Sequence, residues 1–204
     1  MEKIMKHLFL LLSLAACSLV SASETVIFSF PGDKFGKGPG LTQNGETITF
    51  APVSRMYIDK KFDPAGGRIS FQVKFHPVPT EKKDENIQHH FWAAHGNNST
   101  VASGIFLERN DSIQVHFYVF NAKKKTIACS AKIKLPADKT IELDFIWNAN
   151  SISIKVNGLL FAKKNYSGTL LPGTRFLIGT SSADRAIIPM TLEKLQLYAP
   201  VSVP

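Results

Sequence analysis

The sequence has few cysteines, few helical stretches and a single long hydrophobic run. Its 204 residues contain two cysteines, Cys17 and Cys129, which excludes a small disulfide-framed fold and a zinc site with four cysteine ligands. The long apolar run lies at the N-terminus, so a membrane protein with several spans is excluded. Hydrophobic residues make up 44% of the chain and charged residues 20%, which is the balance of a folded protein rather than a disordered one.

The first 22 residues have the pattern of an export signal. A charged segment that includes Lys3 and Lys6 precedes the apolar run 8–16, and small residues follow. Two cleavage sites compete: one after Ala22, and one before Cys17, because residues 14–17 resemble the lipobox of bacterial lipoproteins, whose cysteine is lipidated. In the second case the signal ends at Ala16. In either case we expect an extracytoplasmic protein, secreted or lipid-anchored at the cell envelope, and the membrane as a partner only through that anchor.

The net charge is positive. The whole chain carries +8, and +7 remains when the two lysines and one glutamate of residues 1–22 are removed. Lysine pairs in turns are usually solvated, but a positive charge also attracts anionic partners such as acidic polysaccharides. We do not expect nucleic acid as a partner, because an exported chain without a recognised nucleic-acid-binding motif offers no basis for it.

Apolar and polar residues alternate through most of the chain after residue 24. The alternation is clear in 68–76, 113–119, 141–147 and 152–156, and turn residues separate these segments at 110–111, 148–150 and 157–158. Period two is typical of half-buried strands, and the short turns favour antiparallel pairing. The sequence therefore predicts an all-β, two-sheet antiparallel sandwich that forms a single domain over residues 23–204, without an internal linker.

The order of these strands resembles a known superfamily. Residues 67–73 fit the form G-x-I-S-F-x-V, Trp147 precedes a V-N-G hairpin at 156–158, an I-G strand ends at Gly179, and the last strand ends at Tyr198. This pattern resembles the laminin-G-like jelly roll of the concanavalin A-like lectin and glucanase superfamily, over residues 25–198. The resemblance implies two curved sheets with neighbouring first and last strands, and a face or rim that binds glycans or proteins.

The glucanase motif of that superfamily is incomplete here. Glycoside hydrolysis requires two carboxylates at a defined separation. Glucanases of this fold place them on one strand as Glu-x-Asp-x-x-Glu, whereas Trp147 follows Glu142 and Asp144 in place of the final glutamate. One carboxylate is missing, so we interpret Glu142 and Asp144 as outward-facing acids of an alternating strand.

A polysaccharide lyase with an atypical site is the alternative enzyme. Residues 114–116 match the Gln-Ile/Val-His motif of alginate lyases, and positions i and i+2 of a strand share a face. The family's later motif would fall on 175–181, where Ser181 replaces the tyrosine that transfers the proton. Tyr118 or Tyr166 would have to replace it.

Metal and thiol chemistry have little support in the sequence. His89 and His90 are adjacent, so on a strand they would face opposite ways, and we expect no cofactor. Calcium is the one possible ion, because some laminin-G domains hold it. Asp111 and Asp184, in predicted loops, are the candidate ligands. Cys129 lies in an alternating stretch and is predicted to be a small packed thiol.

The sequence favours a noncatalytic module that binds an extracellular glycan, and the net charge makes an acidic polysaccharide the candidate ligand. A protein-interaction module at the cell surface is a further alternative. The polar residues of several strands would bind the ligand on one shared face, unless they are only the solvated side of a sheet and Trp92 belongs to the core. The predicted ligand-binding residues are Gln72, Lys74, His76, His90, Trp92, Gln114, His116 and Tyr118.

Overall fold

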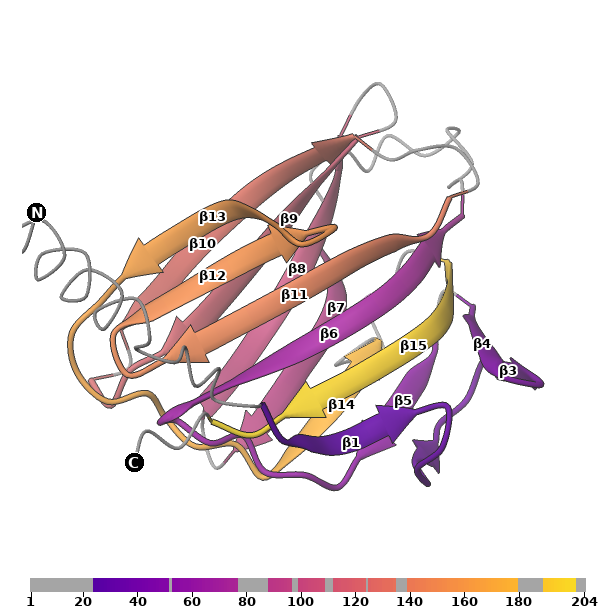
Figure 1. Cartoon of the computed structure of the whole chain (residues 1–204), viewed down its shortest axis with the longest axis horizontal. Helices are drawn as coiled ribbons and strands as arrows, with labels where there is room; N and C mark the ends of the chain where they lie inside the picture. The colour runs from indigo at the N-terminus through magenta and orange to yellow at the C-terminus, as the bar shows by residue number, and fades with distance from the viewer. Residues whose placement is uncertain are drawn as a thin grey trace, which may run out of the picture.

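The computed structural model describes residues 24–51, 53–76, 88–96, 99–108, 112–123, 125–134, 139–179 and 189–200 (Figure 1). Every regular element in these ranges is a β-strand, and all the paired strands are antiparallel. A helix long and apolar enough to cross a membrane does not occur in this part of the chain. The predicted fold class is therefore confirmed. The first 22 residues, with Cys17, and the loop residues Asp111 and Asp184 lie outside the described ranges.

The first layer is an eight-stranded sheet, the front layer in Figure 1. Its order is β13-β12-β11-β6-β15-β4-β3, and β1 also pairs with β15. The first and last strands are thus neighbours, as the resemblance implied. The strands are β1 (Val26–Phe30), β3 (Leu41–Asn44), β4 (Thr47–Phe50), β6 (Gly66–Phe75), β11 (Ile141–Asn148), β12 (Ser151–Val156), β13 (Leu159–Asn165) and β15 (Met190–Tyr198).

The second layer is a seven-stranded sheet behind the first. Its order is β10-β9-β8-β7-β14-β5-β2. The strands are β2 (Gly36–Lys37), β5 (Arg55–Ile58), β7 (Gln88–Gly96), β8 (Ser99–Glu108), β9 (Ser112–Phe120), β10 (Thr126–Lys134) and β14 (Arg175–Gly179).

The core between the layers is made by the apolar half of each alternating strand. Phe145 from β11 packs its ring 5.5 Å from that of Phe117 on β9 and 5.5 Å from that of Trp92 on β7, so aromatic rings of both sheets meet there. Phe176 of β14 adds a ring 6.0 Å from Trp92. Burial of such large side chains is the main favourable contribution to a fold of this kind.

The predicted Asn157-Gly158 turn joins β12 to β13. Both residues have positive φ, 48° and 78°, as a two-residue turn that matches the twist of a hairpin requires. The Asn157 side chain also accepts a hydrogen bond of 2.9 Å from the backbone N–H of Glu142, which ties the turn to β11.

Candidate functional site

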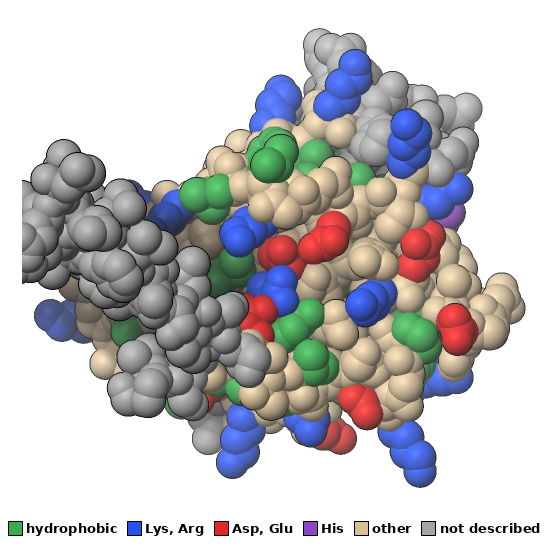
Figure 2. All heavy atoms as spheres, in the orientation of Figure 1, with side chains coloured by type: hydrophobic (Ala, Val, Ile, Leu, Met, Phe, Trp, Pro, Cys, Tyr) green, Lys and Arg blue, Asp and Glu red, His purple; other side chains and the backbone are tan. Residues whose placement is uncertain are grey.

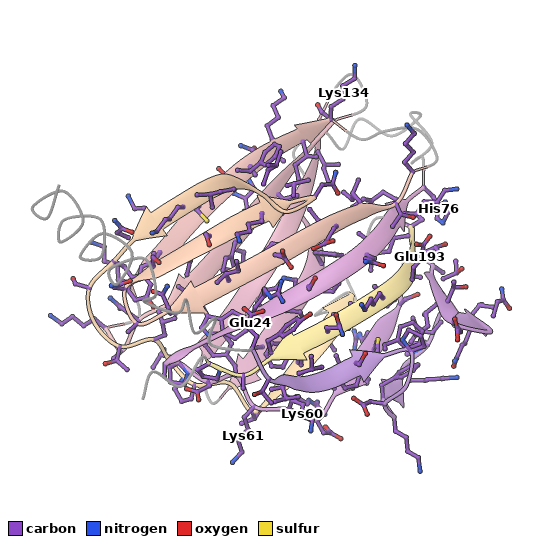
Figure 3. All side chains as sticks on the ribbon, viewed as in Figure 1. Glu24, Lys60, Lys61, His76, Lys134 and Glu193 are labelled. Carbon is purple, nitrogen blue, oxygen red and sulfur yellow. The ribbon has the colours of Figure 1, made fainter. Side chains whose placement is uncertain are left out.

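The predicted ligand-binding residues fall on two different sheets. Gln72 and Lys74 lie on β6, and His76 directly follows it, at the outer face of the eight-stranded sheet, where His76 Nε2 is 2.7 Å from the Thr191 hydroxyl (Figure 3). Gln114, His116 and Tyr118 lie on β9 in the seven-stranded sheet.

The prediction of one shared face is therefore wrong. The apolar partners of both sets are buried in the core between the sheets, so the two polar sets point to opposite sides of the sandwich. Alternation identifies which side chains leave the core, but it does not tell which sheet a strand joins.

Trp92 lies in the core rather than on a ligand-binding face. Its side chain is 0% exposed and packs against Phe117, Phe145 and Phe176. The cause is a register shift between His90 and Trp92, which inserts one extra residue, Phe91, into β7. Such a bulge reverses the alternation, so a residue two positions after His90 no longer shares its face.

His90 keeps a position in line with His116. The register pairs His90 with Gly104, and Gly104 with His116, so the three residues lie in one cross-strand row over β7, β8 and β9. The side chain of His90 lies outside the described part of the structure, so its place on a ligand-binding face stays a prediction.

A second row crosses the whole seven-stranded sheet and contains two tyrosines. Tyr57 and Tyr118 are both partly exposed, and each alternates with buried core residues, so both face outward. Four strand-to-strand steps separate them, a distance of about 19 Å at the usual strand spacing. We call this set the tyrosine row. In register order its members are Gly36, Tyr57, Leu177, Ala93, Ala102, Tyr118 and Ala128.

The middle of the tyrosine row has small or short side chains. Leu177 and Ala93 are 3% and 1% exposed, although neither belongs to the central core cluster. Because cross-strand partners share a face, both lie on the outer side with Tyr57. The row thus has larger side chains toward its ends, and its middle residues Leu177 and Ala93 are covered rather than open to solvent.

Cationic and aromatic groups surround the row. The guanidinium carbon of Arg175 lies 5.0 Å from the centre of the Tyr57 ring, a cation–π contact. At the other end, the Tyr118 ring makes an edge contact with Phe120 at 6.1 Å. Gln114 and His116 precede Tyr118 by four and two residues on the same face, so they lie within about 14 Å of it.

The strands of this sheet are rich in positive charge. Glu108, at the end of β8, is the one carboxylate among their residues. Five basic residues accompany it, so the sheet favours an anionic ligand. They are Lys37, Arg55, Lys132, Lys134 and Arg175.

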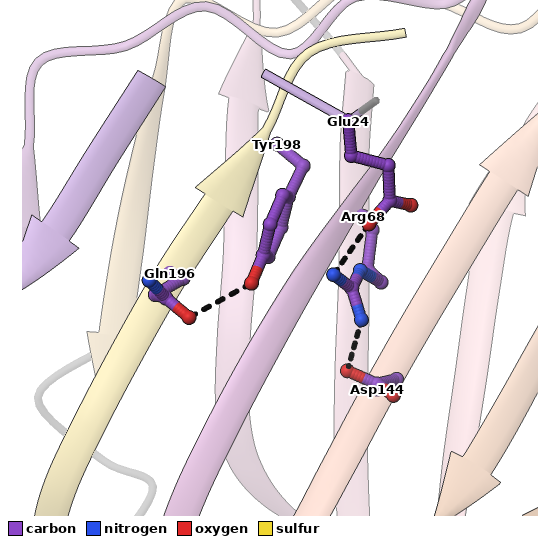
Figure 4. A network of polar contacts seen from close by, with 5 residues as sticks. All are labelled: Glu24, Arg68, Asp144, Gln196 and Tyr198. Atoms are coloured by element: carbon purple, nitrogen blue, oxygen red, sulfur yellow. Dashed lines mark hydrogen bonds and ion pairs between the residues drawn. The ribbon is translucent and has the colours of Figure 1, made fainter. Parts of the chain in front are cut away.

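The opposite outer face contains a compact polar network around Arg68 (Figure 4). One guanidinium nitrogen lies 3.4 Å from Asp144 Oδ1, and the other pairs with Glu24. The same guanidinium lies 3.8 Å from the centre of the Tyr198 ring, and the Tyr198 hydroxyl donates a 2.8 Å hydrogen bond to Gln196. Burial raises the pKa of Tyr198, while Arg68 acts in the opposite direction.

This network accounts for one of the acids of the glucanase-like motif. Asp144 faces outward as predicted, but it is 2% exposed and its charge is balanced by Arg68. Figure 2 shows this face with acidic and basic side chains interspersed, which differs from the basic seven-stranded sheet. Asp144 is therefore held in an ion pair on this face.

Cys129 is the packed thiol that its alternating stretch predicted. It is free, 9% exposed, and burial raises its pKa to about 11. In the ranges that the structure covers, no group of three His, Cys, Asp or Glu side chains is placed to hold a metal ion.

Tyr57 belongs to the tyrosine row but is absent from the ligand-binding residues that the sequence predicts. The sequence does contain a signal for it, because the apolar residues Met56 and Ile58 alternate with Tyr57, and both are buried. The segment is only four residues long, however, and four residues give a weak alternation.

Comparison with known proteins shows the fold. No protein-family model and no curated protein sequence matches the chain. Solved structures do match. The receptor-binding domain of botulinum neurotoxin type G has a TM-score of 0.63 at 9% identity, over 86% of this chain and 48% of that one, so the chain spans about half of its length.

Two enzymes match over nearly their full length. LamAcat from Zobellia galactanivorans has a TM-score of 0.58 at 10% identity, with coverage of 88% of this chain and 99% of that one. The β-glucanase of Bacillus licheniformis has a TM-score of 0.57 at 13% identity, with coverage of 84% and 97%. The chain is a jelly-roll β-sandwich of the concanavalin A-like kind. Its narrower resemblance to laminin-G domains stays a prediction.

Proposed function

We propose that the protein is an exported, noncatalytic binding module that recognises an extracellular glycan on the outer face of its seven-stranded sheet. The observation that carries the proposal is the tyrosine row, in which Tyr57 and Tyr118 face outward on one sheet, four strand-to-strand steps apart. An extended chain of several sugar rings would lie across the row. Each tyrosine would stack on one ring.

The neighbouring side chains suit such a ligand. Amide and imidazole groups such as those of Gln114 and His116 form hydrogen bonds with hydroxyl groups, which is how a few polar groups orient a ligand on an apolar surface. The guanidinium of Arg175 can donate two parallel hydrogen bonds to one carboxylate or sulfate. We therefore propose an acidic polysaccharide as the ligand class.

The absence of catalysis is part of the proposal. Glycoside hydrolysis uses two carboxylates, and the strands of the seven-stranded sheet contain one, Glu108. The similarity to glucanases and to a receptor-binding domain supports a glycan or receptor ligand only by analogy of fold.

A lyase is the second candidate, because Gln114, His116 and Tyr118 occupy alternate positions on one exposed face. That placement would put an amide and a phenol beside the same sugar, with the imidazole of His116 between them, although its Nε2 is buried. A lyase would cleave the chain by removing a proton next to a uronate carboxyl, and it would leave an unsaturated product.

The test is binding to a panel of polysaccharides, alginate and polygalacturonate as acidic chains and laminarin as a neutral one. We expect Tyr57→Ala and Tyr118→Ala each to weaken binding to an acidic chain up to tenfold, as the loss of one stacking contact predicts. Gln72→Ala, on the opposite face, is the control and should bind like the wild type.

Each outcome decides between the candidates. Ultraviolet absorbance from an unsaturated product would establish the lyase and overturn the noncatalytic proposal. Binding that survives both tyrosine substitutions would show that the tyrosine row is not the site. If no polysaccharide binds, the glycan proposal fails and the protein-interaction module remains.

A further inference from the structure

The hairpin of β12 and β13 exposes three consecutive large apolar residues. Leu159, Leu160 and Phe161 are 68%, 57% and 50% exposed. They follow the Asn157-Gly158 turn directly. Figure 2 shows hydrophobic side chains at the upper edge of the molecule, where Figure 1 places β13. Exposed apolar side chains that cluster in this way mark an interaction surface.

These three side chains project from both faces of β13. Leu159 pairs with Val156, whose side chain is buried, whereas Leu160 pairs with Lys155 on the outer side. Phe161 is the extra residue at a register shift. A protein partner that covered one face of the sheet would leave part of this set in water. A fluid apolar medium would surround all three.

The strand is poorly suited to pairing with a second copy. It is the edge of the eight-stranded sheet, but its bulge disrupts the row of backbone groups that another strand would need. Lys163 and Lys164 follow on the same edge, and charged residues there oppose strand addition.

The charge on the hairpin itself has one sign. The hairpin contains Lys155, Lys163 and Lys164 and no carboxylate. Strand β10, which lies beside β13, adds Lys132 and Lys134, again without a carboxylate. The nearest strand with acids is β11, where Arg68 balances Asp144 and the backbone of Glu142 is hydrogen-bonded to Asn157 of the turn, so one carboxylate stands against five lysines.

We propose that the β12–β13 hairpin docks on an anionic phospholipid surface. Leu159, Leu160 and Phe161 would enter the boundary between headgroups and acyl chains, and the lysines would contact lipid phosphates. Apolar side chains flanked by lysines are the combination that holds a peripheral segment at a charged bilayer surface. The site does not include the tyrosine row, and the substitutions that test it, on β13, leave Lys132 and Lys134 of the seven-stranded sheet unchanged.

Sedimentation with sucrose-loaded vesicles tests the proposal. All proteins are full-length and carry Cys17→Ala, so that acylation does not contribute. We expect binding to vesicles of 70% phosphatidylcholine and 30% phosphatidylglycerol, and at least tenfold weaker binding to pure phosphatidylcholine. Leu160→Ser with Phe161→Ser, and separately Lys163→Gln with Lys164→Gln, should each weaken binding to the anionic vesicles about tenfold.

Matched controls come from elsewhere on the surface. Val26→Ser with Val53→Ser removes two other exposed apolar side chains, 44% and 45% exposed. Lys60→Gln with Lys61→Gln removes a lysine pair far from Lys134, at the lower edge in Figure 3. Both control variants should bind like the parent.

Three results would overturn the proposal. The hairpin variants could bind vesicles as well as the controls do. Binding could be equal on neutral and anionic vesicles. The parent could also form a dimer in light scattering that Leu160→Ser with Phe161→Ser dissociates, which would make the hairpin an interface between copies.

Discussion

The Cys129 thiol is buried on β10 among the apolar side chains of its strand, and burial disfavours its charged form. Its pKa of about 11 lies well above the ordinary value of 9.0. Because the thiolate is the reactive form, we expect native protein carrying Cys17→Ala to react with a thiol reagent at pH 8 about a hundredfold more slowly than unfolded protein.

The pH dependence of labelling supplies the check. The rate for the folded protein should keep rising with pH toward about 11, whereas the rate for the unfolded protein should level off above 9.0. Fast labelling of the folded protein at pH 8 would show that Cys129 is not held in the core.

Asp144 and Glu142 lie on the same strand, but only Asp144 is deeply buried and paired. Asp144→Ala removes an acceptor from Arg68 and leaves part of a buried charge uncompensated. We expect it to lower the free energy of unfolding by about 3 kcal/mol. Glu142→Ala, at a partly exposed site that makes no ion pair within the described residues, is the control and should lower the free energy of unfolding less, by no more than about 1 kcal/mol. Urea denaturation of both variants measures the difference, and equal losses would contradict this account of the network.

At the scale of elements, Gly179 fixes the junction of β14 and β5. Its φ is +99°, and a Cβ atom there would lie 2.2 Å from the backbone oxygen of Ser54. Gly179→Ala therefore has to displace backbone as well as adopt a strained conformation. Gly45 also has a positive φ, +57°, but a Cβ atom there would meet nothing within 4 Å.

The expected result is a large difference between the two glycines. Gly45→Ala should cost about 1 kcal/mol of stability, the usual price of a left-handed residue that gains a Cβ. Gly179→Ala should cost at least about 3 kcal/mol more, in thermal or urea unfolding, because of the added collision. Similar costs for both would mean that the β14–β5 junction adjusts without strain.

The strands also show which features of the fold can be predicted from the sequence. Alternation in 68–76, 113–119 and 141–147 correctly separated core residues from outward residues, and the turn at Asn157 was read correctly. Alternation could not assign β6 and β9 to different sheets, because pairing between distant segments leaves no local pattern in the sequence. Nor could it place Trp92, because the extra residue in β7 is visible only in the register.

At the scale of the whole molecule, charge differs between the two sheets. The strands of the seven-stranded sheet have five basic residues and one carboxylate. The strands of the eight-stranded sheet have six basic residues and three acids, but three of the lysines, Lys155, Lys163 and Lys164, lie on the β12–β13 hairpin at its edge. Its strands β6, β11 and β15 balance three basic residues against the three acids. The sum of charges over a face sets the potential that an approaching ligand meets. Away from the β12–β13 edge, an anionic chain should therefore be drawn to the seven-stranded side.

Two charge-reversal variants with the same net charge test which side binds. Lys132→Glu with Lys134→Glu changes the seven-stranded sheet, and Lys74→Glu with Lys194→Glu changes the other. At low ionic strength we expect the first variant to lose affinity for alginate at least tenfold more than the second. Added salt should shrink the difference, because exposed charges are screened over about 10 Å at 0.1 M ionic strength. Equal losses would mean that only net charge matters, and a larger loss in the second variant would place the ligand on the side of Gln72, Lys74 and His76.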